Sequence, residues 1–275
     1  METGTDAGRG ASLDAAALER YAAALVIADG YPSTRLFLSH PEVRLDGTTL
    51  WIPAGPWHIT GHRNRRDAPA ALSDPEIPGS GGEPIDPALT AGWRAAGLLV
   101  DQFGRPIHPD WRELLAHPGI GLPTGLGFFW RWGPNATVDA LVTRRGARGT
   151  EVLLVRRRDV GKWALPGGFV DRADAGVQDA ALRELAEETG LVLPAPRTEI
   201  ALALRSPNSI TTLHAWTENT VVRIDGDPDH LADAPLTPAE AEVSDVAWTD
   251  LETARKLDMF DRHASYLALA GEPRS

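Results

Sequence analysis

The chain has no cysteine among its 275 residues, which excludes disulfide bonds, catalytic thiols and zinc sites built from thiolates. It also has no apolar run close to the roughly 20 residues that a membrane-spanning helix needs. Lysine is almost missing: Lys162 and Lys256 are the two lysines among 27 basic residues. The 38 acidic residues bring the net charge to −11, which argues against nucleic acid or an anionic membrane as a partner.

The remaining composition, 43% hydrophobic and 24% charged residues, is typical of a soluble globular protein. The length allows one large domain or two modest ones. The first four residues, METG, are polar and acidic, so we expect no signal peptide and a cytoplasmic protein.

The most informative stretch is residues 167–191, which end in RELAEETGL. Glu184, Glu187 and Glu188 are three and four residues apart, so their carboxylates share one side of a helix. Like charges at this spacing repel one another, which indicates a cation that offsets them. Carboxylate oxygens suit Mg²⁺, which usually combines a few carboxylates with substrate phosphates. A solvated acidic helix is the alternative interpretation.

The ends of this helix can be predicted too. Asp174 is expected as its N-cap and Gly190 as a left-handed C-cap. An apolar stripe for packing is formed by Val177, Ala181 and Leu185. Just before the helix, Gly167 and Gly168 end a strand in a turn that glycine adopts most easily. Strand, glycine turn and acidic helix together predict a cradle for a metal ion and a diphosphate.

This stretch resembles the signature of the Nudix hydrolases, G-x5-E-x7-R-E-U-x-E-E-x-G-U with U apolar, and residues 183–191 match it at every position. Counting from Gly168, Asp174 stands in place of the first Glu, and one extra residue separates it from Arg183. We therefore expect no role for Asp174 beyond capping. The resemblance implies a hydrolase that uses Mg²⁺, with Mn²⁺ as the alternative ion. It also implies metal ligands at Glu184, Glu187 and Glu188, and catalytic roles for Arg183, Glu184 and Glu187.

Other segments are similar to mitochondrial-type ADP-ribose pyrophosphatases and to the ADP-ribose-binding domain of melastatin-type channels. They are residues 104–106 (GRP), 131–135 (RWGPN) with the following Asp139, 215–218 (AWTE) and 263–265 (HAS). This resemblance implies cleavage of ADP-ribose to AMP and ribose 5-phosphate. It implies substrate contacts at Arg131, Trp132, Asn135, Gly168 and Glu218.

Several alternatives stay open. The substrate of a Nudix hydrolase could instead be NADH, a nucleotide sugar or a modified nucleotide, and a non-catalytic ADP-ribose sensor is the third hypothesis. Residues 131–135 could serve packing at a domain junction. The general base is either a glutamate of the signature or a later acid, for which Glu240, Glu242 and Asp245 are the candidates. The expected partner is a small-molecule nucleotide, and a monomer is favoured over a larger assembly.

The order of predicted elements fits an α/β class, the Nudix α/β/α sandwich around a mixed sheet, after a smaller loop-rich α+β domain. We place an N-terminal domain with a role in substrate selectivity at residues 1–125 and the Nudix catalytic domain at residues 126–275. The predicted elements are a helix at 13–28, a hairpin around Asp46-Gly47, mostly loop at 61–92, paired strands at 138–144 and 151–157, strands near 200–205 and 213–224, a short strand at 246–248, and mostly helix at 249–270.

Overall fold

A computed structural model describes residues 44–51, 58–59, 85–112, 124–125, 129, 131–206, 211–239 and 241–271. The predicted helix at 13–28, residues 61–84 of the predicted loop, and Glu240 lie outside the described residues. Among the described residues, no helix is long and apolar enough to cross a membrane.

The chain divides into two compact units, Met1–Asn135 with Arg205–Thr217, and Ala136–Leu204 with Glu218–Ser275. The predicted domains, residues 1–125 and 126–275, stay a prediction. The two units differ from those domains in grouping residues 126–135 and 205–217 with the earlier part of the chain.

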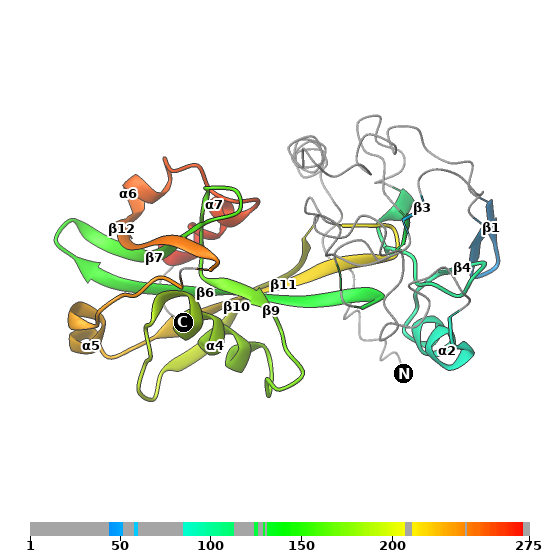
Figure 1. Cartoon of the computed structure of the whole chain (residues 1–275), viewed down its shortest axis with the longest axis horizontal. Helices are drawn as coiled ribbons and strands as arrows, with labels where there is room; N and C mark the ends of the chain where they lie inside the picture. The colour runs from blue at the N-terminus through cyan, green and yellow to red at the C-terminus, as the bar shows by residue number, and fades with distance from the viewer. Residues whose placement is uncertain are drawn as a thin grey trace, which may run out of the picture. The chain divides into compact units, whose positions relative to one another are not determined.

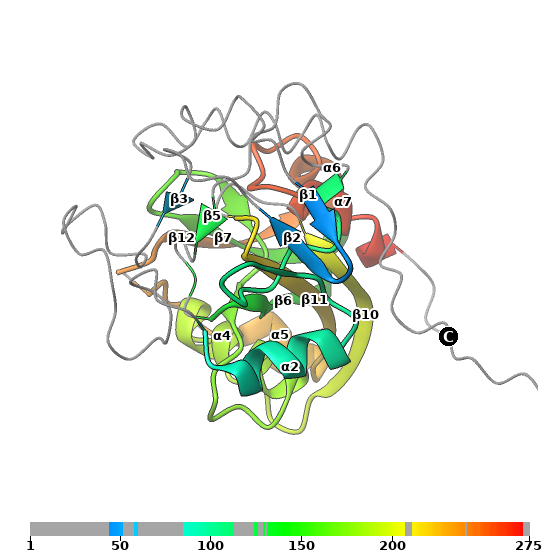
Figure 2. The same ribbon diagram turned by 90° about the vertical axis from the view of Figure 1, so that its right-hand side faces the viewer.

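The first unit contains short strands and helix α2 among its described residues. Strands β1 (Arg44–Asp46) and β2 (Thr49–Trp51) form the predicted antiparallel hairpin, with Gly47 at a positive φ of 56° in the turn (Figure 2). Strand β4 (Val100–Asp101) pairs parallel with β2, and β3 (His58–Ile59) pairs parallel with β5 (Thr124–Gly125). These pairings leave the unit with two small sheets among its described residues.

Helix α2 (Pro87–Ala95) was not predicted, because residues 61–92 were read as mostly loop. Its start nevertheless has a local cause. The carboxylate of Asp86 accepts a hydrogen bond from the amide of Ala88, and Pro87 occupies the first helical position, where its missing N–H costs nothing.

The second unit is built on a sheet with the strand order β10-β11-β6-β7-β12. Strands β6 (Gly133–Gly146) and β7 (Gly149–Arg157) pair antiparallel around the predicted turn, and β12 (Val243–Asp250) pairs antiparallel with β7. The predicted strands near 200–205 and 213–224 are β10 (Arg197–Ser206) and β11 (Ala215–Asp225). Two short strands, β8 (Trp163–Ala164) and β9 (Gly167–Phe169), pair with β7 and β6.

Helices cover both faces of this sheet (Figure 1). Helices α4 (Val177–Thr189) and α5 (Pro228–Asp233) lie on one face, and α6 (Leu251–Ala254) and α7 (His263–Tyr266) on the other. Alternate strand residues face opposite ways. Val138, Ala140 and Val142 therefore join the core under α4, whereas Leu141 joins the core with Tyr266 of α7. This three-layer packing is the predicted sandwich.

The end of the chain is less helical than predicted. Helices α6 and α7 and the 3₁₀-helix η3 (Leu269–Gly271) are short. Residues 258–260 instead run beside strand β8 and pair with its backbone. There the amide of Trp163 donates to the carbonyl of Asp258, and the amide of Phe260 donates to the carbonyl of Trp163. Backbone pairing with a strand thus takes the hydrogen bonds that a longer helix would have used.

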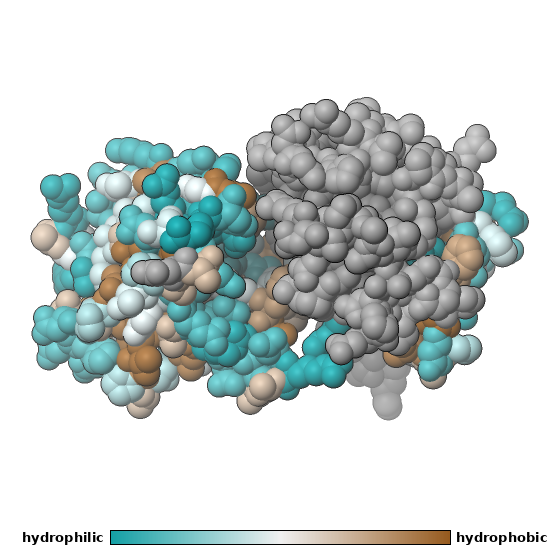
Figure 3. Space-filling view, in the orientation of Figure 1, coloured by the Kyte–Doolittle hydropathy of each residue, from teal (hydrophilic) through white to brown (hydrophobic). Residues whose placement is uncertain are grey.

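Hydrophilic residues dominate the visible face of the second unit, with apolar residues scattered among them (Figure 3). Its exposed large apolar side chains include Val160, Val192 and Ile200. Single exposed apolar residues are normal on soluble proteins, so this surface does not by itself indicate a docking site.

Candidate active site

The site begins with two glycines that leave no space for a side chain. Strand β9 pairs with β6 so that Gly167 stands opposite Asp139 and Gly168 opposite Val138. A Cβ on Gly167 would collide with the carbonyl oxygen of Val138 and lie 2.7 Å from a carboxylate oxygen of Asp139. A Cβ on Gly168 would lie 2.5 to 2.9 Å from the carboxylate of Glu184. Glycine is therefore required for the turn to sit directly against the acidic helix.

Helix α4 brings its three glutamates to this turn with different exposures. Glu184 and Glu188 are buried, with 9% and 7% of their surface exposed, whereas 59% of the Glu187 side chain is exposed. The amide of Gly167 donates to Oε2 of Glu188 at 3.0 Å, which fixes that carboxylate against β9. The helix ends as predicted, with Gly190 in the left-handed region.

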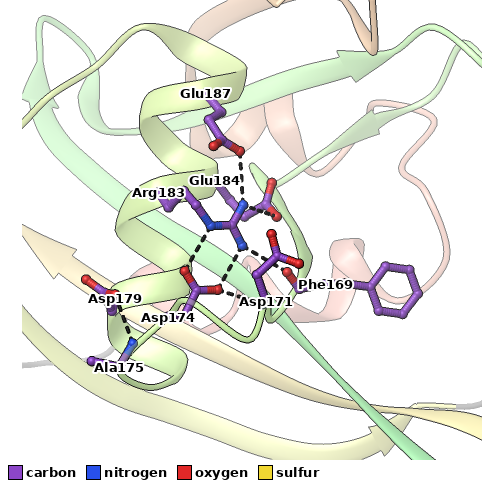
Figure 4. Close-up of polar contacts among 8 residues, drawn as sticks. All are labelled: Phe169, Asp171, Asp174, Ala175, Asp179, Arg183, Glu184 and Glu187. Carbon is purple, nitrogen blue, oxygen red and sulfur yellow. Dashed lines mark hydrogen bonds and ion pairs between the residues drawn. The ribbon is translucent and has the colours of Figure 1, made fainter. Parts of the chain in front are cut away.

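Arg183 connects these carboxylates (Figure 4). Its Nη1 donates to Glu184 at 2.9 Å and to Glu187 at 3.0 Å, and its Nη2 donates to the carbonyl of Phe169 at 3.0 Å. A planar guanidinium suits this bridging role because its donors point in fixed directions. Arg183 thus orients two glutamates and holds α4 to the glycine strand.

The capping role predicted for Asp174 is wrong. The N-cap of α4 is Gly176, and no side chain caps the helix there; Asp179, in the first turn, accepts from the amide of Ala175. Asp174 lies in the turn before the helix, where its carboxylate accepts two hydrogen bonds from Arg183, at 3.0 and 2.9 Å. The extra residue before Arg183 lengthens this turn, so Asp174 reaches the guanidinium instead of the helix end. The hydrogen bonds from Arg183 hold the pKa of Asp174 below its ordinary value.

The buried glutamates are short of positive charge. Burial raises the pKa of Glu188 to about 8; the amide of Gly167 and the charge of Arg157 act against this rise, and the charges of Glu184 and Glu242 add to it. Burial also raises the pKa of Glu184, with Arg183 opposing and the carboxylates of Glu187 and Glu242 adding. The protein therefore gathers negative charge here that its own cations do not fully offset.

Glu242 was one of three later acids considered for the general base, and the structure brings it to the site. It precedes β12, and the nearby backbone is attached to the end of α4: the amides of Thr237 and Ala239 donate to the carbonyls of Thr189 and Glu188. Its charge raises the pKa of both Glu184 and Glu188, so its carboxylate lies within electrostatic range of them. Asp245, by contrast, lies within strand β12.

A hard divalent cation fits this site by donor type and by charge. The oxygens of Glu184, Glu187 and Glu188 are those that Mg²⁺ prefers, and the raised pKa values indicate that a cation would be stabilised. As they stand, no three acidic or histidine side chains of the described residues converge closely enough to hold an ion. Arg183 occupies oxygens of Glu184 and Glu187, so ion binding requires these side chains to turn.

A buried polar network lies behind the glycine turn, on the α7 side of the sheet. Asn219 donates to Asp139 at 2.5 Å and accepts from Thr137 at 2.9 Å, and Tyr266 lies 3.3 Å from the same amide nitrogen. The amide of Leu165 donates to Nδ1 of His263, which places the proton of a neutral imidazole on Nε2, 3.7 Å from Asp139. The network braces the segment that carries Gly167 and Gly168.

The predicted substrate contacts lie in different surroundings. Asn135 is buried and donates from its amide nitrogen to the carbonyls of Arg131 and Gly133, which braces the turn before β6. Trp132 is buried, with the guanidinium of Arg105 5.9 Å from its ring centroid. Arg131 and Glu218 are exposed. Substrate binding by these residues stays a prediction.

Two of the resembling segments meet inside the first unit, together with a histidine that precedes a third. The amide of Gly133 donates to the carbonyl of His214, and His214 Nε2 lies 3.2 Å from Asp101, which also pairs with Arg105 at 2.6 Å. Burial lowers the pKa of His214 to about 4, with Asp101 opposing. The segments 104–106 and 131–135 therefore meet at one buried charged cluster with His214, which directly precedes the segment 215–218, although these residues are far apart in the sequence.

The chain is similar in sequence to known proteins. Residues 133–270 match the model of the NUDIX domain family. The mitochondrial ADP-ribose pyrophosphatase of Rattus norvegicus is 26% identical over 209 residues, which cover 65% of this chain and 57% of that protein. This chain therefore spans somewhat more than half of that relative's length.

Solved structures also resemble the chain. The NUDIX domain of Shewanella oneidensis NrtR complexed with ADP ribose is 26% identical with a TM-score of 0.39, covering 50% of this chain and 86% of that one. A MutT/nudix family protein from Enterococcus faecalis is 24% identical with a TM-score of 0.41, covering 50% and 61%.

Proposed function

The chain belongs to the NUDIX domain family, and from that premise we propose that it hydrolyses ADP-ribose to AMP and ribose 5-phosphate in a Mg²⁺-dependent reaction. The observation that carries the proposal is the acidic face of α4, with Glu184, Glu187 and Glu188 beside the Gly167–Gly168 turn. ADP-ribose as the substrate is supported by the likeness to a mitochondrial ADP-ribose pyrophosphatase, which extends over 209 residues and so beyond the NUDIX match. All three carboxylates are present, which favours an enzyme over a sensor.

The chain's own residues have distinct roles in this reaction. Glu184, Glu187 and Glu188 would hold the ion, and Arg183 orients two of them. When bound, the ion supplies positive charge for the diphosphate oxygens as their negative charge grows. We assign the general-base role to Glu242, which lies within electrostatic range of Glu184 and Glu188, whereas Arg183 binds Glu184 and Glu187 directly.

The reaction consumes one water. Glu242 would accept a proton from a water that attacks one phosphorus, and the bond from that phosphorus to the bridging oxygen breaks. AMP and ribose 5-phosphate then leave, one carrying the new oxygen and the other the former bridging oxygen. Among the predicted substrate contacts, Arg131 is the exposed cation, and we propose it as a contact to the nucleotide.

A product assay on the full-length protein tests this function. ADP-ribose, NADH, a nucleotide sugar and a nucleoside triphosphate are incubated with Mg²⁺, with Mn²⁺ or with a chelator, and the products are separated by chromatography. We expect the highest kcat/KM for ADP-ribose, equal amounts of AMP and ribose 5-phosphate, and no turnover with the chelator. Equal kcat/KM for ADP-ribose and NADH would contradict the substrate. Binding of ADP-ribose without any hydrolysis would show a sensor.

A further inference from the structure

Strand β7 ends in Arg156 and Arg157, a third arginine, Arg158, follows it, and the three side chains have different partners. Arg156 donates to the carbonyl of Gly161 at 2.9 Å, and Arg158 donates to the carbonyl of Val243 at 3.4 Å. Arg157 instead forms a fork with Asp159, Nε to Oδ1 at 3.1 Å and Nη2 to Oδ2 at 2.9 Å. Successive strand residues point to opposite faces, so the side chain of Arg157 points away from that of Arg156.

The guanidinium of Arg157 is held in one orientation, and part of its hydrogen-bonding capacity remains available. Its Cζ lies 4.5 Å from the ring centroid of Phe260, and the fork to Asp159 sets the orientation of the plane. The side chain is 35% exposed. Within the described part of the chain, Nη1 has no hydrogen-bond partner. Arg157 therefore holds a donor-rich edge ready for an acceptor.

The backbone places Arg157 next to one acid of the site: Arg157 pairs with Val243 of β12, and the amide of Arg158 donates to the carbonyl of Glu242 at 2.9 Å. Burial acts to lower the pKa of Arg157, but the carboxylates of Asp159, Glu188 and Glu242 outweigh it and raise that pKa. The same charge acts on Asp139 and His263 behind the glycine turn. Arg157 is thus within electrostatic range of both a proposed metal ligand and the proposed base, although no hydrogen bond joins it to either.

We propose that Arg157 is a phosphoryl-binding residue, whose outer guanidinium edge receives an oxygen of the diphosphate held at α4. The inference rests on the proposed function, since it names a further contact to the same substrate. A guanidinium matches the geometry of phosphoryl oxygens, and a fixed positive charge stabilises the negative charge that grows there during cleavage. Phe260 and Asp159 lower the entropy lost on binding because they orient the side chain beforehand.

The competing role is charge balance alone, in which Arg157 offsets Glu188 and Glu242 and never meets the substrate. The two roles predict different results at saturating Mg²⁺. A phosphoryl contact is lost in Arg157→Gln whether or not the metal is bound. A charge-balancing arginine would change the affinity for Mg²⁺ and leave the affinity for the ligand alone.

Calorimetric titration of the full-length protein separates these roles. The probes are the α,β-methylene analogue of ADP-ribose and inorganic pyrophosphate, each at saturating Mg²⁺, and Mg²⁺ alone. We expect Arg157→Gln to lower the affinity for both phosphate-containing ligands by about ten- to a hundredfold, as for a lost hydrogen bond to a charged group. Arg157→Lys should lie between, because it keeps the charge without the fork. The matched control, Arg158→Gln, should bind both ligands as the wild type does.

Each outcome decides a question. Unchanged ligand affinity in Arg157→Gln, with altered Mg²⁺ affinity, overturns the proposal in favour of charge balance. Equal losses in Arg157→Gln and Arg158→Gln also overturn it, because the effect would then be general electrostatics. If the wild type binds pyrophosphate but not the ADP-ribose analogue, ADP-ribose is refuted as the substrate. The role of Arg157 is then still tested by comparing pyrophosphate binding to the wild type and to Arg157→Gln. Binding of neither ligand by the wild type refutes both.

Discussion

Replacing Asp174 by alanine separates a positioning role from a helix-start role. The change removes three hydrogen bonds, from the amide of Asp171 at 2.7 Å and from Arg183 at 3.0 and 2.9 Å. Bonds to a charged partner are worth about 1.5–3 kcal/mol each when buried. Because a quarter of the Arg183 side chain is exposed, we reduce the expected contribution of each of its two hydrogen bonds to the unfolding free energy to about 1 kcal/mol. With the amide bond, the expected loss is about 2–3 kcal/mol of unfolding free energy.

The loss of activity should be larger than this stability suggests. Without Asp174, Arg183 loses the partner that fixes its plane, and Glu184 and Glu187 lose their orientation. Groups that orient metal ligands typically contribute about ten- to a hundredfold to activity or metal affinity, and we expect that loss in kcat/KM. The measurements are urea unfolding and ADP-ribose hydrolysis over a range of Mg²⁺ concentrations.

Asp179→Ala is the matched control for this experiment (Figure 4). Asp179 also accepts a backbone amide at the start of α4, from Ala175 at 3.0 Å, but does not contact Arg183 in the structure. It should lose about 1 kcal/mol of stability, as a lost cap does, and keep its kcat/KM. If both variants lose the same stability and both retain wild-type kcat/KM, the positioning argument for Asp174 is refuted.

Three further results are expected. Glu187→Gln should fold normally and lose turnover by orders of magnitude, because an ion ligand becomes neutral; unchanged turnover would remove Glu187 from the metal site. Glu242→Gln should lower kcat by about 10²–10⁴-fold, as for a lost general base, with little change in Mg²⁺ affinity measured by calorimetry; a wild-type kcat would exclude that role. Burial and the charge of Arg205 hold the pKa of His108 well below its ordinary 6.5, so its contribution to stability is present above pH 6.5 and is lost as the pH falls. His108→Asn keeps an acceptor for the amide of Asp110, which donates to Nδ1 of His108. Between pH 7.5 and 5.5, the unfolding free energy of this variant should depend less on pH than that of the wild type, by about 1.4 kcal/mol per pH unit below 6.5. Equal pH slopes for the variant and the wild type would contradict the assignment.

Local signals predicted the centre of the site well. The apolar stripe of α4, its C-cap at Gly190 and the paired glycines before it depend on residues close in sequence, and the structure has all of them. The hairpin at Gly47 and the paired strands β6 and β7 were predictable for the same reason. Spacing and turn chemistry act over a few residues, so a single sequence displays them.

The misses involve contacts that no local pattern reveals. Asp174 was read as a cap because its position next to a helix was visible and its bonds to Arg183, nine residues away, were not. Glu242 and Arg157 approach Glu188 from other parts of the chain, and their charges could be placed only once the sheet was known. Exposure alone could not have found them either, because charged residues on loops are common.

The grouping of residues 205–217 with the first unit has a consequence for synthesis on the ribosome. His108 donates its backbone amide to the carbonyl of Leu213, and Asp110 pairs with Arg205 at 2.9 Å, across 95 residues of sequence. A nascent chain that has emerged only to Gly125 cannot make these contacts. The N-terminal part therefore cannot complete its fold until residues 205–217 have been synthesised. Protection of the nascent chain against protease should appear late in synthesis instead of rising in two steps. For the same reason, a catalytic fragment cut out at one linear position would carry residues 205–217 without their partners.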